Sequence, residues 1–132
     1  MNKIKIHHFL GDSICSTMDD VLKTLDQSVN GVNEFFIAHE HTMFPYLTVL
    51  INGPYSYVYC VPDEVAAGSL AFSEDAEMDL DPGGISIFYT NNPSEEIEIC
   101  NDYVIPKSLA VEIVKEFAET GKMSDCAEWE EL

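Results

Sequence analysis

The chain has 132 residues, of which 24 are acidic and 6 are basic, and its formal net charge at pH 7 is -18. All six basic residues are lysines. Because binding to nucleic acid or to an anionic membrane surface needs clusters of Lys or Arg, this composition argues against both functions. The length fits one domain, residues 1–132, and a hydrophobic content of 46% supplies a folded core rather than a disordered chain.

The N-terminus and the cysteines bear on the cellular compartment. No apolar stretch of targeting length follows Lys3 and Lys5, and no run of residues is long enough to span a membrane. The four cysteines are widely spaced and form no C-x-x-C pair. We therefore expect a cytoplasmic protein in which all of them are free thiols: Cys15, Cys60, Cys100 and Cys126.

The first expected elements are a strand over residues 3–9 and a helix that follows it. Ser16 or Thr17 offers the capping oxygen, and apolar residues then recur at helical spacing from Met18 as far as Val29. Asn30-Gly31 is a stop signal, so we expect the helix to end there.

The middle of the chain has an apolar period of two, which predicts β-strands. Asn52-Gly53 predicts a turn, but Pro54 lacks a backbone donor and disfavours the simplest two-residue hairpin. The strand candidates are joined by short turns and predict an antiparallel sheet: 34–41, 46–52, 55–61, 69–72, 85–90 and 95–100.

A second helix is expected to begin at Pro106, which suits the first helical position, and to end at Gly121. Residues 123–132 follow it and contain the only tryptophan, Trp129. Together these elements predict an α+β fold, with a central antiparallel sheet flanked by the helix near the N-terminus and by the C-terminal helix.

Candidate catalytic and metal-binding residues are sparse. His39 and His41 lie two apart on the strand expected at 34–41, so both side chains would point to one face and could share a metal with further ligands. The simpler interpretation is two half-exposed histidines at the end of a strand. No nucleophile motif or phosphate-binding glycine loop is present, and we expect no cofactor.

The charges are segregated along the sequence. The 83 residues between Lys23 and Lys107 contain 14 acidic residues and no Lys or Arg. Such uncompensated charge favours a basic partner, whose approach it would steer, although a solvated loop without a partner is the alternative. The candidate partner-binding residues lie on one loop and on the turn and strand near residue 95: Glu74, Asp75, Glu77, Asp79, Asp81, Glu95, Glu96 and Glu98.

A row of tyrosines marks the strand expected at 55–61. Tyr55, Tyr57 and Tyr59 share one face of that strand. Tyrosine is favoured at protein interfaces, but a helix lying across this face would bury the row as core. The sequence leaves both interpretations open.

The C-terminal third resembles a family of bacterial immunity proteins, the Imm proteins encoded beside polymorphic and contact-dependent growth-inhibition toxins. The pattern that carries the resemblance is a helix ending in Phe117 and Thr120-Gly121, then a short linker to Trp129 and a final Glu-Glu-Leu. The stretch YLTVLINGPYSYVYCVPDE is similar to the central hairpin of the same family. One departure is the linker, where Met123-Ser124-Asp125 stands in place of a frequent proline.

The resemblance implies a non-enzymatic α+β protein that binds the C-terminal domain of a cognate toxin in the cytoplasm. Many such toxins attack nucleic acids and are basic, which suits the acidic residues above. The resemblance also makes Phe117, Gly121 and Trp129 structural residues, with the indole packed on the second helix. Two alternatives are a metal-dependent hydrolase that uses His39 and His41, and an acidic mimic of nucleic acid.

Overall fold

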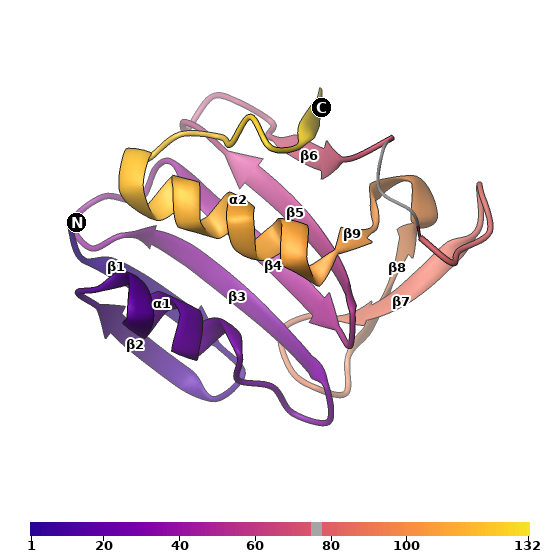
Figure 1. Cartoon of the computed structure of the whole chain (residues 1–132), viewed down its shortest axis with the longest axis horizontal. Helices are drawn as coiled ribbons and strands as arrows, with labels where there is room; N and C mark the ends of the chain where they lie inside the picture. Colours follow the sequence, from indigo (N-terminus) through magenta and orange to yellow (C-terminus); the bar gives the residue numbers. More distant parts are fainter. Residues whose placement is uncertain (75–77) are drawn as a thin grey trace.

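The structure, a computed structural model, describes residues 1–74 and 78–132 and is built around one large antiparallel sheet (Figure 1). The strand order is β10-β6-β5-β4-β3-β1-β2, and a short β9 pairs with β5. Every neighbouring pair is antiparallel, as the sequence predicts. The strands are β1 (Ile4–His8), β2 (Gly11–Cys15), β3 (Val32–His39), β4 (Tyr46–Asn52), β5 (Tyr55–Val61), β6 (Ser69–Phe72), β9 (Ile105–Pro106) and β10 (Glu128–Glu131).

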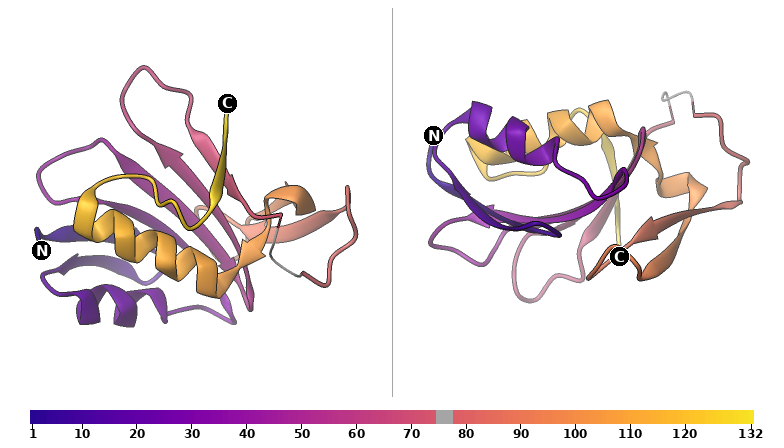
Figure 2. Two further views of the ribbon diagram at one scale, coloured as in Figure 1. Left: turned by 45° about the horizontal axis from the view of Figure 1, so that its top comes forward. Right: turned by 90° about the horizontal axis from the view of Figure 1, so that it is seen from below.

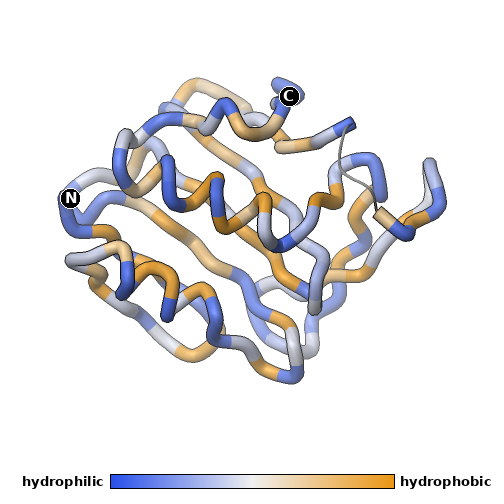
Figure 3. Tube along the Cα trace, in the orientation of Figure 1, coloured by the Kyte–Doolittle hydropathy of each residue, from blue (hydrophilic) through white to orange (hydrophobic). Residues whose placement is uncertain are grey.

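Two helices, α1 (Met18–Leu25) and α2 (Lys107–Thr120), cover one face of this sheet (Figure 2). The core between the two helices and the sheet is apolar, as the hydropathy of the central strands and helices indicates (Figure 3). Its largest fully buried side chains include Phe35 and Phe117. The α+β class expected from the sequence is therefore confirmed. Among the described helices, none has the length and apolar character needed to cross a membrane.

The start of α1 is the expected one, but its predicted end is wrong. The Thr17 hydroxyl accepts a hydrogen bond from the Asp20 amide at 3.2 Å and caps the helix, which ends at Leu25. Asn30 and Gly31 instead adopt φ values of 52° and 82° in a tight turn. That turn joins Val29 and Val32, whose backbones form a β-bridge, so Val29 lies beyond the helix and not on its apolar stripe.

The turn between β4 and β5 also differs from expectation. Asn52 pairs directly with Tyr55, so Gly53 and Pro54 form a two-residue hairpin loop. Gly53 supplies a φ of 58°, and Pro54 occupies the second central position, whose amide is not needed by the ladder. The missing backbone N–H of Pro54 therefore removes no hydrogen bond from this hairpin.

Helix α2 is bounded as the sequence predicts to within one residue. Pro106 lies immediately before the first helical residue, and Gly121 follows the last with a φ of 71°. The Gly121 amide donates to the Phe117 carbonyl at 2.8 Å, which closes the helix in the left-handed conformation that glycine favours.

A hairpin of β7 (Ile85–Tyr89) and β8 (Glu96–Cys100), followed by the short 3-10 helix η1 (Asn101–Tyr103), packs against the opposite face of the sheet (Figure 2). We call this opposite side the outer face. A second, smaller core of buried residues lies beneath the hairpin, and Tyr55 and Tyr57 pack against it. The tyrosine row is thus partly core, but its cover is a hairpin and not a helix. The buried members are Leu50, Phe88, Ile99 and Val104.

Candidate partner-binding surface

The acidic loop before β7 alternates between apolar side chains that pack inward and carboxylates that face solvent. Met78 and Leu80 pack against the smaller core, whereas Asp79 and Asp81 are exposed. Glu74, at the other end of the loop, is also exposed. Two of the residues expected to bind a partner, Asp75 and Glu77, lie outside the described residues.

Asn101 joins this loop to the β7–β8 hairpin. Its side-chain amide donates to the Asp81 carbonyl, and its backbone amide donates to the Gly84 carbonyl, each at 2.9 Å. Glu96 and Glu98 lie on the exposed side of β8, and Glu95 lies in the turn before it. The structure thus connects the two acidic segments that the sequence separates. We call these carboxylates the acidic hairpin region: Glu74, Asp79, Asp81, Glu95, Glu96 and Glu98.

The acidic hairpin region forms no ion pair with a cationic side chain in the part of the chain that the structure describes. Four ion pairs form there, and none of them includes these six carboxylates. Two of the four involve a histidine instead of a lysine and are ionic only when that ring is protonated. Repulsion among such carboxylates raises the free energy of the free protein, and a basic partner would relieve it.

His39 and His41 do not form the pair that the sequence suggests. Strand β3 ends at His39, whose ring packs against Phe117 with centroids 5.5 Å apart. His41 lies beyond the strand in an exposed turn, with Nε2 3.7 Å from a Glu40 carboxylate oxygen. The expectation that both histidines lie on one strand is therefore wrong, because β3 stops before His41, although both residues line one hollow beside the end of α2. Across residues 1–74 and 78–132, no three His, Cys, Asp or Glu side chains are placed to hold a metal ion.

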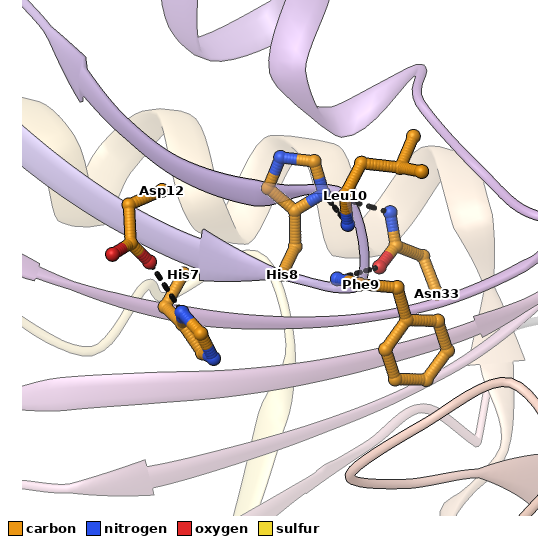
Figure 4. Close-up of polar contacts among 6 residues, drawn as sticks. All are labelled: His7, His8, Phe9, Leu10, Asp12 and Asn33. Carbon is orange, nitrogen blue, oxygen red and sulfur yellow. Dashed lines mark hydrogen bonds and ion pairs between the residues drawn. The ribbon is translucent and has the colours of Figure 1, made fainter.

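The β1–β2 turn contains a polar network that the sequence analysis missed (Figure 4). Asn33 is fully buried; its side-chain oxygen accepts from the Phe9 amide at 3.0 Å, and its amide donates to the Gln27 carbonyl at 2.8 Å. The ring Nδ1 of His8 lies 3.2 Å from the same amide and 3.4 Å from the Leu10 backbone nitrogen. Burial, with a smaller contribution from neighbouring His7, lowers the pKa of His8, so its neutral ring accepts these hydrogen bonds.

Trp129 is one of the residues that the resemblance makes structural, with its indole packed on the second helix. It lies on β10 opposite Ala71 of β6, and its side chain is partly buried against the main core. The indole nitrogen donates to the Ser124 carbonyl at 2.8 Å. Ser124 stands in the linker where the family pattern often has proline, and its buried hydroxyl accepts from the Cys126 amide at 3.0 Å. The serine thus stabilises this turn through a hydrogen bond.

The four cysteines are free, as expected. Cys15 and Cys60 are fully buried in the main core, and Cys100 and Cys126 are more accessible. Burial raises the pKa of Cys15, and it raises the pKa of Cys60 to about 11. Both buried thiols are therefore protonated at neutral pH and act as small apolar side chains.

An uncovered aromatic cluster on the outer face is a further feature that sequence analysis missed. Phe36 of β3 and Tyr46 of β4 have ring centroids 4.6 Å apart, and Phe44 lies 5.7 Å from Tyr46. We call these three residues the aromatic patch. All three are partly exposed, unlike Phe35, which points to the helix side and is fully buried. The alternation of apolar and polar residues along β3 could have shown which side chains face outward. However, the run Phe35-Phe36-Ile37 is apolar on both faces, so it does not single out Phe36.

Comparison with known proteins places the chain in a family. The Imm1 immunity protein family model matches residues 14–131, which include the central hairpin and nearly all of the C-terminal stretch described above. A double-stranded DNA deaminase immunity protein of Burkholderia cenocepacia (strain H111) is 25% identical over 100 residues, covering 76% of each chain. The chain therefore belongs to the Imm1 family of immunity proteins.

Proposed function

We propose that the chain binds and neutralises the C-terminal domain of a cognate bacterial toxin, and that this toxin is a basic protein that acts on nucleic acid. The observation that carries the proposal is the acidic hairpin region, whose described carboxylates have no cation partner. The similarity to an immunity protein named for a double-stranded DNA deaminase supports a toxin that modifies nucleic acid.

The physical argument rests on what such a toxin must bind. A protein that acts on DNA or RNA needs a positively charged groove for the phosphate backbone. Carboxylates from an inhibitor can occupy the same cationic sites, and a chain with a net charge of -18 presents them in excess. Charge complementarity of this kind accelerates association by roughly 10–10³-fold.

We infer that neutralisation needs binding alone, without catalysis or a cofactor. The same acidic composition disfavours contact with nucleic acid and with anionic membranes. The proposed place of action is the cytoplasm of the protected cell, where a contact-dependent growth-inhibition toxin would be intercepted after delivery.

The test is a binding and inhibition experiment with the toxin domain encoded beside the gene for this chain. A catalytically inactive toxin domain is expected to form a one-to-one complex with a Kd of about 1 nM or tighter. The active domain is expected to lose its nucleic-acid-modifying activity when an equimolar amount of this chain is added. Absence of both effects would refute the proposal. Equal affinity for several unrelated basic proteins would instead favour a general mimic of nucleic acid.

A further inference from the structure

We propose that the aromatic patch on the uncovered part of the outer face is the centre of the toxin-docking surface, with the acidic hairpin region at its flank. This inference rests on the proposed function and assigns the surface that performs it. The helices cover the other face of the sheet, and the β7–β8 hairpin covers one end of the outer face (Figure 2). The aromatic patch lies on the part that the hairpin leaves uncovered.

Two hollows flank Phe36 on this surface. One has a volume of about 260 Å³, and its lining includes Glu34, Thr48 and Asn91. The other has a volume of about 340 Å³, and its lining includes Asp12 and Ile14. Phe36 and His7 belong to both linings, so together they separate the two hollows. Hollows of this size are near or below the lower limit of small-molecule pockets, and they suit protruding side chains of a protein partner.

Glu34 supplies a fixed negative charge beside the aromatic patch. Its carboxylate accepts hydrogen bonds from the Thr90 hydroxyl at 2.6 Å and from the Asn91 backbone amide at 3.0 Å. Within the described residues, Glu34 forms no ion pair. A carboxylate has more acceptor positions than these two bonds use, so it can still accept from a Lys or Arg of a partner.

The same contacts connect the aromatic patch to the acidic hairpin region. The Asn91 side chain donates to a Glu95 carboxylate oxygen, and residues 91–98 are all exposed. One surface therefore runs from Phe36 through Glu34 to Glu95, with aromatic side chains at one end and carboxylates at the other. Protein interfaces combine an aromatic centre that supplies most of the affinity with a charged rim that steers association.

The occupant that this chemistry fits is a toxin domain that places apolar side chains on Phe36 and Tyr46 and a Lys or Arg beside Glu34. A second copy of this chain would offer equally apolar side chains. However, two chains that each carry a net charge of -18 repel one another. Charge complementarity therefore selects the basic partner over self-association.

Binding of Phe36→Asp to the inactive toxin domain tests the inference. Phe36 is partly buried and its ring packs on Tyr46, so we expect the thermal unfolding temperature to fall, and binding is compared at a temperature at which both proteins are folded. The dissociation constant should rise by at least about 30-fold, mainly through faster dissociation, because loss of a central aromatic anchor costs about 2 kcal/mol or more. The matched control is Met123→Asp, which changes another exposed apolar side chain, beyond the end of α2, and should leave the constant unchanged.

A footprinting measurement on the wild-type chain keeps the inference testable if the variant fails to fold. Hydroxyl radicals should oxidise Met43, which precedes Phe44 and is 68% exposed, more slowly in the complex than in the free chain. Met123, at 39% exposure, should keep its rate of oxidation.

A wild-type chain that binds the toxin with both methionines unprotected would overturn the inference and leave the proposed function intact. An unchanged dissociation constant for a folded Phe36→Asp would do the same. If Met43 becomes protected when the concentration of this chain is raised in the absence of toxin, the surface mediates self-association, and that result would also overturn the inference. A wild-type chain that binds no toxin would refute the proposed function and this inference with it.

Discussion

The side-chain amide of Asn33 on β3 lies 3.2 Å from the ring Nδ1 of His8 on β1, inside the protein (Figure 4). Asn33 uses its remaining hydrogen-bonding capacity on the backbone of Gln27, Phe9 and Glu34. One side chain thus ties the β1–β2 turn and the segment after α1 to the centre of the sheet.

Asn33→Ala should therefore destabilise the fold strongly. The substitution leaves the partly buried Phe9 amide and Gln27 carbonyl and the buried His8 ring nitrogen without their Asn33 partner, and we expect the free energy of unfolding to fall by about 1–3 kcal/mol. Urea denaturation measures the change. The control, Asn2→Ala, removes an exposed side chain and should change stability by less than about 0.5 kcal/mol. A loss below about 1 kcal/mol for Asn33→Ala would contradict the importance of the network.

His8 should make stability depend on pH in a defined direction. Its pKa in the folded protein is below the ordinary value of 6.5, so the unfolded chain takes up the proton first. The stability that His8 contributes is complete above pH 6.5 and is lost as the pH falls towards the folded-state pKa. Protonation would also remove the acceptor that the Asn33 amide and the Leu10 backbone nitrogen share.

The measurement compares the wild type with His8→Gln, because protonation of carboxylates relieves repulsion at low pH and stabilises both proteins. As the pH falls from about 7.5 to about 5.5, the wild type should lose stability relative to the variant. Parallel stability profiles for the two proteins would show that His8 does not titrate differently on folding.

The sequence patterns of helix ends and strands correctly located those elements whose ends are set by residues close to them in the sequence. Gly121 closes α2 in the left-handed conformation, and the strand expected over 55–61 is observed with those bounds. The same patterns failed to predict strands that form only because they pair with a strand distant in the sequence. Strand β2 contains Gly11, Asp12 and Ser13, which are poor strand formers, and it exists because β1 offers a free edge. Strand β10 likewise depends on β6 for its pairing.

The candidate surface could be predicted only in part for the same reason. Charge is a property of composition, so the exposed acidic residues such as Glu96 and Glu98 were visible in the sequence. The aromatic patch was not, since the face that Phe36 occupies depends on its register with Thr48 and His7 on other strands. The link from Glu34 to Thr90 spans 56 residues and needs the folded hairpin.

Gly68→Ala tests the contact between β5 and the loop that follows it. Gly68 has a φ of 109°, and a Cβ at this position would lie 2.5 Å from the Tyr59 ring. Tyr59 is held there because its hydroxyl donates to the Ala67 carbonyl. We expect the variant to lose about 2 kcal/mol or more, from backbone strain and steric overlap together.

Gly11→Ala separates these two causes. Gly11 has a φ of 122°, with no heavy atom of the described structure within 4 Å of the added Cβ, so this variant carries strain without overlap. Thermal denaturation should show a smaller loss for Gly11→Ala, of about 1 kcal/mol. Equal losses at the two positions would mean that the Tyr59 ring moves aside without cost.

Charge reversal in the acidic hairpin region should slow association with the toxin domain. Glu96→Lys with Glu98→Lys changes two exposed carboxylates on β8, and we expect the association rate constant to fall by roughly 3- to 10-fold at about 50 mM salt. The difference should shrink at about 300 mM salt, where screening weakens the field. Dissociation should change little if these residues form the rim of the interface and not its centre.

The matched control is Glu116→Lys with Glu119→Lys, which makes the same change in net charge at two exposed positions of α2, on the opposite face of the sheet. Surface-plasmon-resonance kinetics of both variants against the inactive toxin domain show whether the position of the charge or the net charge slows association. Equal slowing in the two variants would assign the effect to the net charge of -18 alone and would remove the acidic hairpin region from the interface. Slowing confined to the β8 variant is the expected result, because the field of a carboxylate is strongest within about 10 Å of it.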